Sequence, residues 1–214
     1  MAAPNRNQLI VEGNDDLFSL VELMRAHIGW PHTKEDAPVR FEAGGGVERI
    51  LERDYLAVKL KTSGLKALGV VLDADANPQA RYESVRNLCA GVFPGLPKEM
   101  PAEGLIASNG QQRFGVWIMP DNVSEGSLET FLRLMIPEES VPLWKHATES
   151  VSRARTMGAT CRDCHIEKAN LYTWLAWQDP PGQSGGTALT RKILDPLSGS
   201  SGPFVKWFRN LYQI

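Results

Sequence analysis

The chain has 214 residues, of which 43% are hydrophobic and 22% are charged, and its formal net charge is −2. This length and composition are ordinary for a globular protein with one good-sized core and a small extension. The charge excludes a strongly basic nucleic-acid binder, and no apolar run approaches the roughly 20 residues of a membrane span. Residues 141–214 nevertheless hold nine Lys or Arg against five Asp or Glu, so basic charge gathers towards the C-terminus.

Two features bear on the compartment. Residues 1–7 lack the apolar stretch of a signal peptide. The cysteines Cys89, Cys161 and Cys164 are odd in number, which suits a reducing compartment better than a disulfide framework. We therefore expect a cytoplasmic protein that has no membrane segment.

The N-terminal part of the sequence predicts a strand, a turn and a helix. Residues 8–11 are an apolar run that ends at Glu12 and Gly13, and apolar residues at helical spacing follow from residue 17. Glu is a poor strand residue, so Glu12 at the strand tip is a candidate functional group. Asp16 lies in the first helical turn near the same rim, where it either joins a site or stabilises the helix dipole.

A second strand is predicted over residues 39–43, followed by the glycines 44–46 and a helical stretch from residue 47 to about 60. Glycines between a strand and a helix can bring backbone N–H groups near a phosphate. Without a following Lys-Ser pair, they are also typical of a tight turn.

The run at residues 68–72 is apolar and rich in Val, and it ends in the carboxylates of Asp73 and Asp75. It is typical of a strand buried on both faces of a parallel sheet. Strand alternation would point both carboxylates the same way, at the end of the sheet where ligands bind. Two fixed like charges favour a hard divalent cation, Mg²⁺ or Mn²⁺, between them. The alternative is a solvated turn in which Asp75 caps the next helix.

The next segments predict a helix at 79–90, a connector at 91–104, and a hairpin of strands at 105–108 and 113–119 around Asn109-Gly110. A further helix opens near residues 126–132. Its Glu129, together with Asp121 after the last strand, could approach the acidic rim, although Ser-x-Glu is also common capping chemistry.

The remainder is predicted to be helical, over 141–156, 163–177 and 203–212, with loops at 179–186 and 197–202. The fold class is therefore α/β, with a mostly parallel central sheet that has helices on both faces. We expect a metal-binding core at residues 1–140 and a helical C-terminal extension, packed on it, at residues 141–214.

The segment Cys161-Arg162-Asp163-Cys164-His165 matches the c-type haem attachment pattern. Haem attachment needs export, for which no signal is present, and a zinc site that adds His146 has no fixed geometry. A chance match is the third interpretation. Lys168, on the following helix, either reaches a phosphate or extends to solvent.

Glu12-Gly13 with Asp16, followed by Asp73-x-Asp75 on a later strand end, resembles the Toprim domain of topoisomerases, bacterial primases and OLD-family nucleases. The resemblance covers about residues 7–135. The later Glu129 and Lys168 segments are similar to stand-alone Toprim-like proteins related to the OLD nucleases. The resemblance implies Glu12 as a metal ligand or general acid/base, and Asp73 and Asp75 as metal ligands. It implies further ligands at Asp16 and Glu129, and a phosphate-contacting, catalytic Lys168.

This resemblance implies a nuclease that depends on Mg²⁺ or Mn²⁺, acts on DNA or RNA, and works with a partner ATPase, since the chain has no ATPase segment. Trp174 and Trp177 either stack on bases or lie in the core. One alternative is a non-catalytic subunit that binds nucleic acid or a nucleotide. Another is a haloacid-dehalogenase-type phosphatase, whose strand also ends in Asp-x-Asp but which has no need of Glu12.

Overall fold

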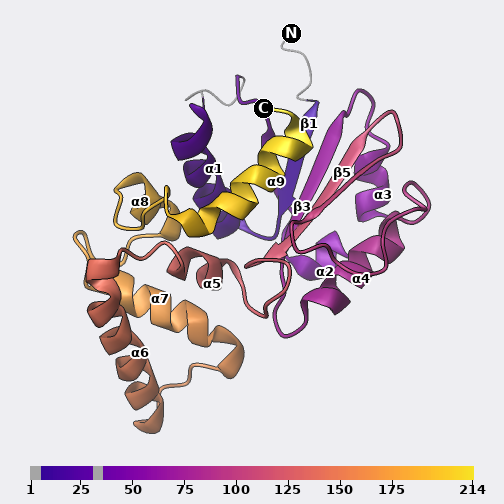
Figure 1. Cartoon of the computed structure of the whole chain (residues 1–214). Helices are drawn as coiled ribbons and strands as arrows, with labels where there is room; N and C mark the ends of the chain where they lie inside the picture. Colours follow the sequence, from indigo (N-terminus) through magenta and orange to yellow (C-terminus); the bar gives the residue numbers. More distant parts are fainter. Residues whose placement is uncertain (1–5, 31–35) are drawn as a thin grey trace.

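The computed structural model describes residues 6–30 and 36–214, so the interpretation of the first five residues lies outside the described part. Five strands form one sheet (Figure 1): β1 (Asn7–Val11), β2 (Arg40–Ala43), β3 (Ala67–Asp73), β4 (Leu105–Ser108) and β5 (Arg113–Met119). The helices around it are α1 (Asn14–Ile28), α2 (Val47–Ile50), α3 (Tyr55–Leu60), α4 (Pro78–Cys89), α5 (Leu128–Arg133), α6 (Val141–Thr156), α7 (Ile166–Ala176), α8 (Gly185–Thr190) and α9 (Gly202–Tyr212).

The strand order is β2-β1-β3-β5-β4, in which only β4 runs antiparallel to its neighbour. The predicted mostly parallel α/β fold is confirmed. Residues 67–72 of the central strand β3 are all buried, as expected for a run of apolar residues without alternation. The strand ends of β1 and β3 lie side by side because these two strands pair in parallel.

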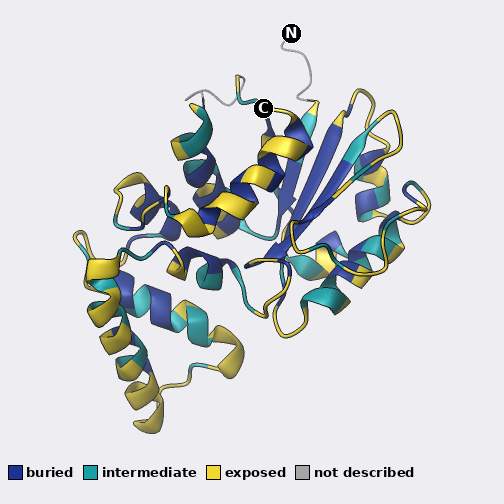
Figure 2. Cartoon of the chain, in the orientation of Figure 1, coloured by how far each residue is buried: buried dark blue, intermediate teal, exposed yellow. Residues whose placement is uncertain are grey.

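Two apolar layers flank the sheet (Figure 2), because successive strand residues point to opposite faces. Leu9 and Val11 of β1 pack in the layer that includes α1, α5, α7, α8 and α9, whereas Ile10 packs in the layer beneath α2, α3 and α4. Among the described residues, no helix is long and apolar enough to cross a membrane.

Helix α9 lies across the sheet, although it is the last helix of the chain (Figure 1). Gly69 and Gly115 are register partners on β3 and β5, and a Cβ at either would come within 2.5–2.6 Å of Tyr212 or Leu211. The side chain of Trp207 donates to the Leu105 carbonyl at 2.9 Å. The predicted C-terminal helical region is present, and its last helix forms part of the cover of the sheet.

The structure corrects the sequence prediction at two helices. The stretch from 47 to about 60 is not one helix, because residues 51–54 form a turn between α2 and α3. Ile50 and Leu56 are both buried in the same layer, and a continuous helix of 3.6 residues per turn would point them to different sides. Helix α8, within and beyond the predicted loop at 179–186, was not predicted, because it starts with two glycines.

Candidate metal centre

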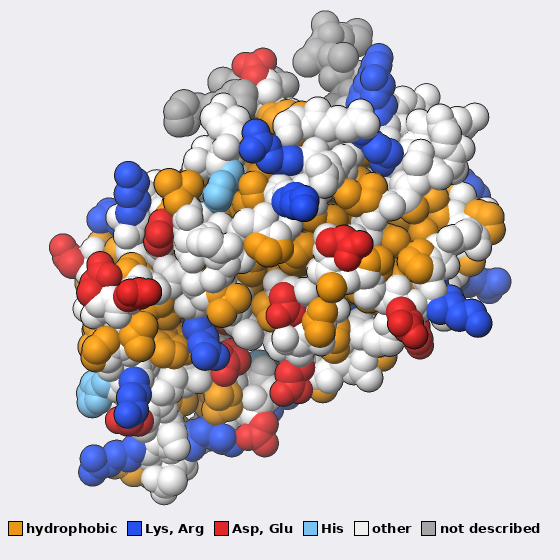
Figure 3. All heavy atoms as spheres, in the orientation of Figure 1, with side chains coloured by type: hydrophobic (Ala, Val, Ile, Leu, Met, Phe, Trp, Pro, Cys, Tyr) orange, Lys and Arg blue, Asp and Glu red, His pale blue; other side chains and the backbone are white. Residues whose placement is uncertain are grey.

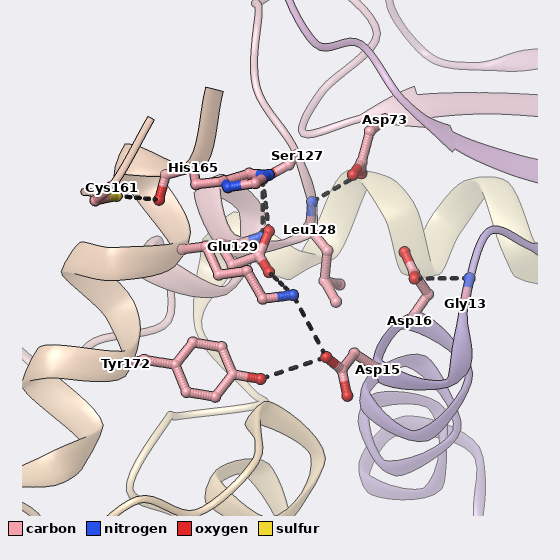
Figure 4. A network of polar contacts seen from close by, with 11 residues as sticks. Gly13, Asp15, Asp16, Asp73, Ser127, Leu128, Glu129, Cys161, His165 and Tyr172 are labelled. Atoms are coloured by element: carbon pink, nitrogen blue, oxygen red, sulfur yellow. Dashed lines mark hydrogen bonds and ion pairs between the residues drawn. The ribbon is translucent and has the colours of Figure 1, made fainter. Parts of the chain in front are cut away.

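Three carboxylates meet where β1 and β3 end, at the sheet edge where parallel α/β proteins bind ligands. Glu12 directly follows β1, and its Oε1 accepts a hydrogen bond of 2.9 Å from the backbone N–H of Asp73 at the end of β3. Asp16 comes from the first turn of α1. Figure 4 shows Asp73 and Asp16 together with Glu129 of α5.

Each of the three carboxylates is held by a backbone N–H group. Besides the Glu12 contact, Oδ2 of Asp16 accepts from Gly13 at 3.0 Å, and Oδ1 of Asp73 accepts from Leu128 at 2.9 Å (Figure 4). The last bond docks the start of α5 on the end of β3. Each of these three bonds engages one carboxylate oxygen, and a carboxylate has a second oxygen that can bind a further ligand.

Burial and mutual repulsion raise the pKa values of these acids. Burial, the largest cause, raises the pKa of Glu12 from 4.5 to about 7, against the hydrogen bond from Asp73 and with a contribution from Asp16. Burial also raises the pKa of Asp16 from 3.8 to about 6. The pKa of Asp73 lies well above its ordinary value because of burial, followed by the charges of Glu12, Asp16 and Glu129. The four acids therefore share one electrostatic environment that a cation would relieve.

Glu129 and Lys168 lie close together at the rim of this cluster. Neither a strand pattern nor a helix pattern in the sequence could have predicted this contact. Lys168 Nζ lies 3.4 Å from Glu129 Oε1 and 3.6 Å from Asp15 Oδ2. Partial burial lowers the pKa of Lys168, but the charges of Glu129 and Asp15 outweigh this, and the net shift is upwards. A charged amine therefore stands beside the acidic cluster.

Asp75 lies beyond the end of β3, although its charge is near enough to Glu12 to contribute to the raised pKa of that acid. Strand β3 ends at Asp73, so alternation does not extend to Asp75, whose φ is 50° and whose backbone pairs with Gly126. Its side chain is 66% exposed and forms an ion pair with Arg81. The alternative reading of Asp75 as a helix cap is wrong, because Asn77 Oδ1 accepts from Ala80 at the start of α4. The role of Asp75 as a ligand stays a prediction.

Two other sequence interpretations are decided by hydrogen bonds. The carboxylate of Asp121 accepts from the backbone of Val123 and Ser124 and so closes its own turn. The N–H groups of residues 44–46 donate to the carbonyls of Val11 and Glu12, which makes the glycines a tight turn around the end of β1. A phosphate would have to displace these bonds.

The donor set fits a hard divalent cation. Glu12, Asp16 and Asp73 offer only oxygen atoms and are largely buried. Their raised pKa values favour the protonated forms, and a bound cation would favour the charged forms instead. Within residues 6–30 and 36–214, no group of three or more His, Cys, Asp or Glu side chains already has the spacing of a metal site. The carboxylate side chains of this cluster would therefore have to move closer together to bind a metal ion.

Sequence reasoning missed two residues of this region, Arg81 and Tyr172. Arg81 of α4 pairs with Asp75 and also donates from Nε to the Asp73 carbonyl at 2.9 Å, so it clamps the end of β3. Tyr172 donates to Asp15 Oδ2 at 3.4 Å (Figure 4). The position of Tyr172 four residues after Lys168, on the same helical face, was the available signal. Nothing comparable marked Arg81.

The structure also bears on the candidate zinc site and on the two tryptophans, Trp174 and Trp177. Cys161 and Cys164 are free thiols, and the His146 ring stacks on Trp177 at 5.2 Å between ring centroids, so the described side chains do not assemble the zinc site. Trp174 is fully buried and belongs to the core, whereas Trp177 is 43% exposed.

Comparison with known proteins gives a family without an assigned activity. The family described as "Protein of unknown function (DUF3226)" matches residues 6–213. No curated protein and no solved structure matches the chain. The chemistry of the site must therefore carry the functional argument.

Proposed function

We propose that this chain, which belongs to the DUF3226 family of proteins of unknown function, is a Toprim-type nuclease. The proposed nuclease depends on Mg²⁺ or Mn²⁺ and acts on DNA or RNA. One observation carries the proposal. The largely buried carboxylates of Glu12 and Asp73, at the ends of two neighbouring parallel strands, and of Asp16, in the first turn of α1, lie close together and have raised pKa values. Such perturbed groups concentrate at functional sites.

Glu12, Asp16 and Asp73 would hold the cation, with Glu129 as a further ligand. The cation would supply Lewis acidity towards a phosphodiester and a water of lowered pKa. Lys168, which stands beside Glu129, would bind and orient the phosphate as a point charge. The Toprim resemblance gives Glu12 two alternative roles, metal ligand or general acid/base. Its pKa of about 7 without a cation suits the second role, whereas direct binding to a cation would lower that pKa.

A specific observation also favours the non-catalytic alternative. Asp75 is paired with Arg81, and Glu129 is paired with Lys168, so two of the five predicted ligands already have protein cations as partners. A single bound cation in a subunit that only binds nucleic acid would be consistent with this. The bond between Glu12 and Asp73 supports the Toprim reading over the phosphatase reading, which gives Glu12 no role. The cytoplasmic location, suggested by three free cysteines, and an ATPase partner remain part of the proposal.

The test compares the wild-type protein with Asp73→Asn, which keeps an oxygen that can accept from Leu128, and with Glu149→Gln, an exposed control on α6. Calorimetry would measure Mn²⁺ and Mg²⁺ binding. Nicking of supercoiled plasmid and cleavage of single-stranded RNA would be followed in parallel. We expect Asp73→Asn to weaken Mn²⁺ binding at least about tenfold and to abolish cleavage, since it removes a charge that faces the cation.

The outcomes separate the two functions. Metal binding and cleavage that both depend on Asp73, and not on Glu149, would establish a metallonuclease. Metal binding without cleavage of any substrate would favour the non-catalytic subunit. Absence of metal binding in the wild-type protein would overturn both.

A further inference from the structure

The outer end of the α6–α7 hairpin, residues 152–165, projects from the molecule, and we call it the arm (Figures 1 and 2). Every residue from 152 to 160 is exposed, although most of them belong to the last turn and a half of α6. Met157 at the tip is 78% exposed. Burial in the core therefore does not explain why the chain extends this helix so far.

An open hollow lies in the arm. Its lining residues are Ser152, Arg155, Thr156, Ala159, Thr160, Cys161 and Arg162. Two guanidinium groups and three hydroxyls supply donors, and the donors of Arg match phosphate oxygens in geometry. Asp163 lies on the rim, where it forms an ion pair with Arg155.

Donor groups continue from this hollow to the acidic cluster. Arg162 Nη2 lies 3.3 Å from Nε2 of His165, the residue that precedes α7. His165 lies three residues before Lys168, and Lys168 and Tyr172, four residues apart, share one face of α7. Lys168 and Tyr172 contact Asp15, and Lys168 also contacts Glu129. Figure 3 shows Lys and Arg side chains at the lower left end, over α6 and α7, with acidic ones among them.

Stabilisation of the α6 helix dipole explains only some of the positive charges in the arm. Arg153 and Arg155 stand in the last turn of α6, where positive charge stabilises the helix dipole. Arg162 lies outside α6, on the connection to α7, and it lines the same hollow as Arg155. The dipole does not account for Arg162, for the hydroxyls beside it, or for its contact with His165.

We propose that the hollow of the arm binds backbone phosphates of a nucleic-acid strand, and that His165 and the α7 face with Lys168 guide the strand to the acidic cluster. The nucleic-acid class of the ligand rests on the proposed function. Phosphate contacts of this kind position a strand without reading its sequence.

The experiment measures binding without cleavage. Fluorescence anisotropy with a labelled single-stranded 20-nucleotide probe, in EDTA, gives the Kd of the full chain over a series of salt concentrations. The arm variant is Arg155→Ala/Arg162→Ala. The matched control is Lys206→Ala/Arg209→Ala, which removes two positive charges from another open hollow, on α9.

We expect the arm variant to raise Kd about tenfold or more at moderate salt. The slope of log K against log salt should fall by about 1.4, because each phosphate contact of a single strand contributes about 0.7. The control pair should change Kd less than about twofold. Circular dichroism of both variants would show that they keep the wild-type fold.

A third variant should bind the strand more tightly than the wild-type chain. Asp163→Asn removes the acid that pairs with Arg155, so the strand should bind about two- to fivefold more tightly. Wild-type affinity in the arm variant, equal losses in both double variants, or no binding by the wild-type chain would overturn the proposal. The result is independent of the nuclease test, since an arm-dependent Kd without any metal-dependent cleavage would sustain the arm and refute the nuclease.

Discussion

At the scale of single residues, the centre is defined by carboxylates that the backbone holds in place while they repel one another. Glu12 and Asp73 are tied through one hydrogen bond, and α5 is tied to Asp73 through another. The same burial that brings these acids together raises their pKa values. The site therefore stores unfavourable charge interactions, which a cation would relieve on binding.

These shifts predict how the stability of the metal-free protein depends on pH. The pKa of Glu12 is raised from 4.5 to about 7, so between these values the folded protein holds a proton that the unfolded chain has released. The contribution of protonated Glu12 to the stability of the folded protein is therefore complete below pH 4.5 and is lost as the pH rises through about 7. Asp16 adds to the loss between 3.8 and about 6. Thermal unfolding in EDTA from pH 5 to 8 should show a falling Tm.

Glu12→Gln provides the control for this prediction, because an amide releases no proton over this range. The variant should show a shallower fall in Tm than the wild type. Added Mn²⁺ should raise the Tm of the wild type most at pH 8, where the carboxylates are charged. Parallel profiles for the two proteins in EDTA would contradict the assignment of the raised pKa to Glu12.

At the scale of elements, the close approach of α9 depends on glycines in the two central strands. Gly69 and Gly115 face each other across β3 and β5, and the side chains of Leu211 and Tyr212 occupy the space where their Cβ atoms would be. Tyr212 Oη also donates to the Gln8 carbonyl at 2.6 Å. The glycines thus set the distance between the helix and the sheet.

Gly115→Ala should therefore destabilise the protein by about 1–3 kcal/mol, the usual cost of overpacking a core. An added Cβ would lie 2.6 Å from Leu211. Urea unfolding at equilibrium measures the change. Gly91→Ala is the matched control, since nothing lies within 4 Å of its added Cβ. If the two variants were equally stable, α9 would have room that the structure does not show.

At the scale of the whole molecule, the C-terminal helices serve different purposes. The apolar side chains of α9 are almost fully buried in the layer over the sheet, whereas the arm is exposed. Helix α7 lies between these extremes, because it buries Leu171 and Trp174 and presents Lys168 to the acidic rim. The helical region thus combines a cover for the sheet with a projecting arm.

Truncation should reveal this division. Removal of residues 202–214 should abolish cooperative unfolding, because it uncovers the central strands and deletes Phe204, Trp207 and Phe208 from the core. Replacement of residues 153–162 by a short glycine linker should leave Tm within a few degrees of the wild type. Circular dichroism melts and size-exclusion chromatography of both proteins measure these effects. A cooperative, monomeric protein without α9 would contradict this division.

Sequence patterns alone predicted the strands, their mostly parallel arrangement, and Glu12 and Asp73 at the strand ends, because these follow from local apolar runs and from where they stop. The prediction that Asp75 shares this strand end was wrong, because β3 ends at Asp73. Prediction failed where local preference yields to packing. The helix at 47–60 breaks so that two parts reach one layer, and α8 forms from glycines that pack against α1, where a Cβ on Gly186 would meet Phe18.

Only the tertiary structure shows which residues make up the acidic cluster and its surroundings. Glu12 and Asp73 could be paired from the sequence, because neighbouring parallel strands end at the same edge. The sequence could not show that Arg81 engages Asp75, or that α7 carries Lys168 to Glu129 across 39 residues of chain, because such contacts depend on helix packing. Local chemistry determined which residues can act here, and the packing of α5 and α7 on the sheet decided which of them meet.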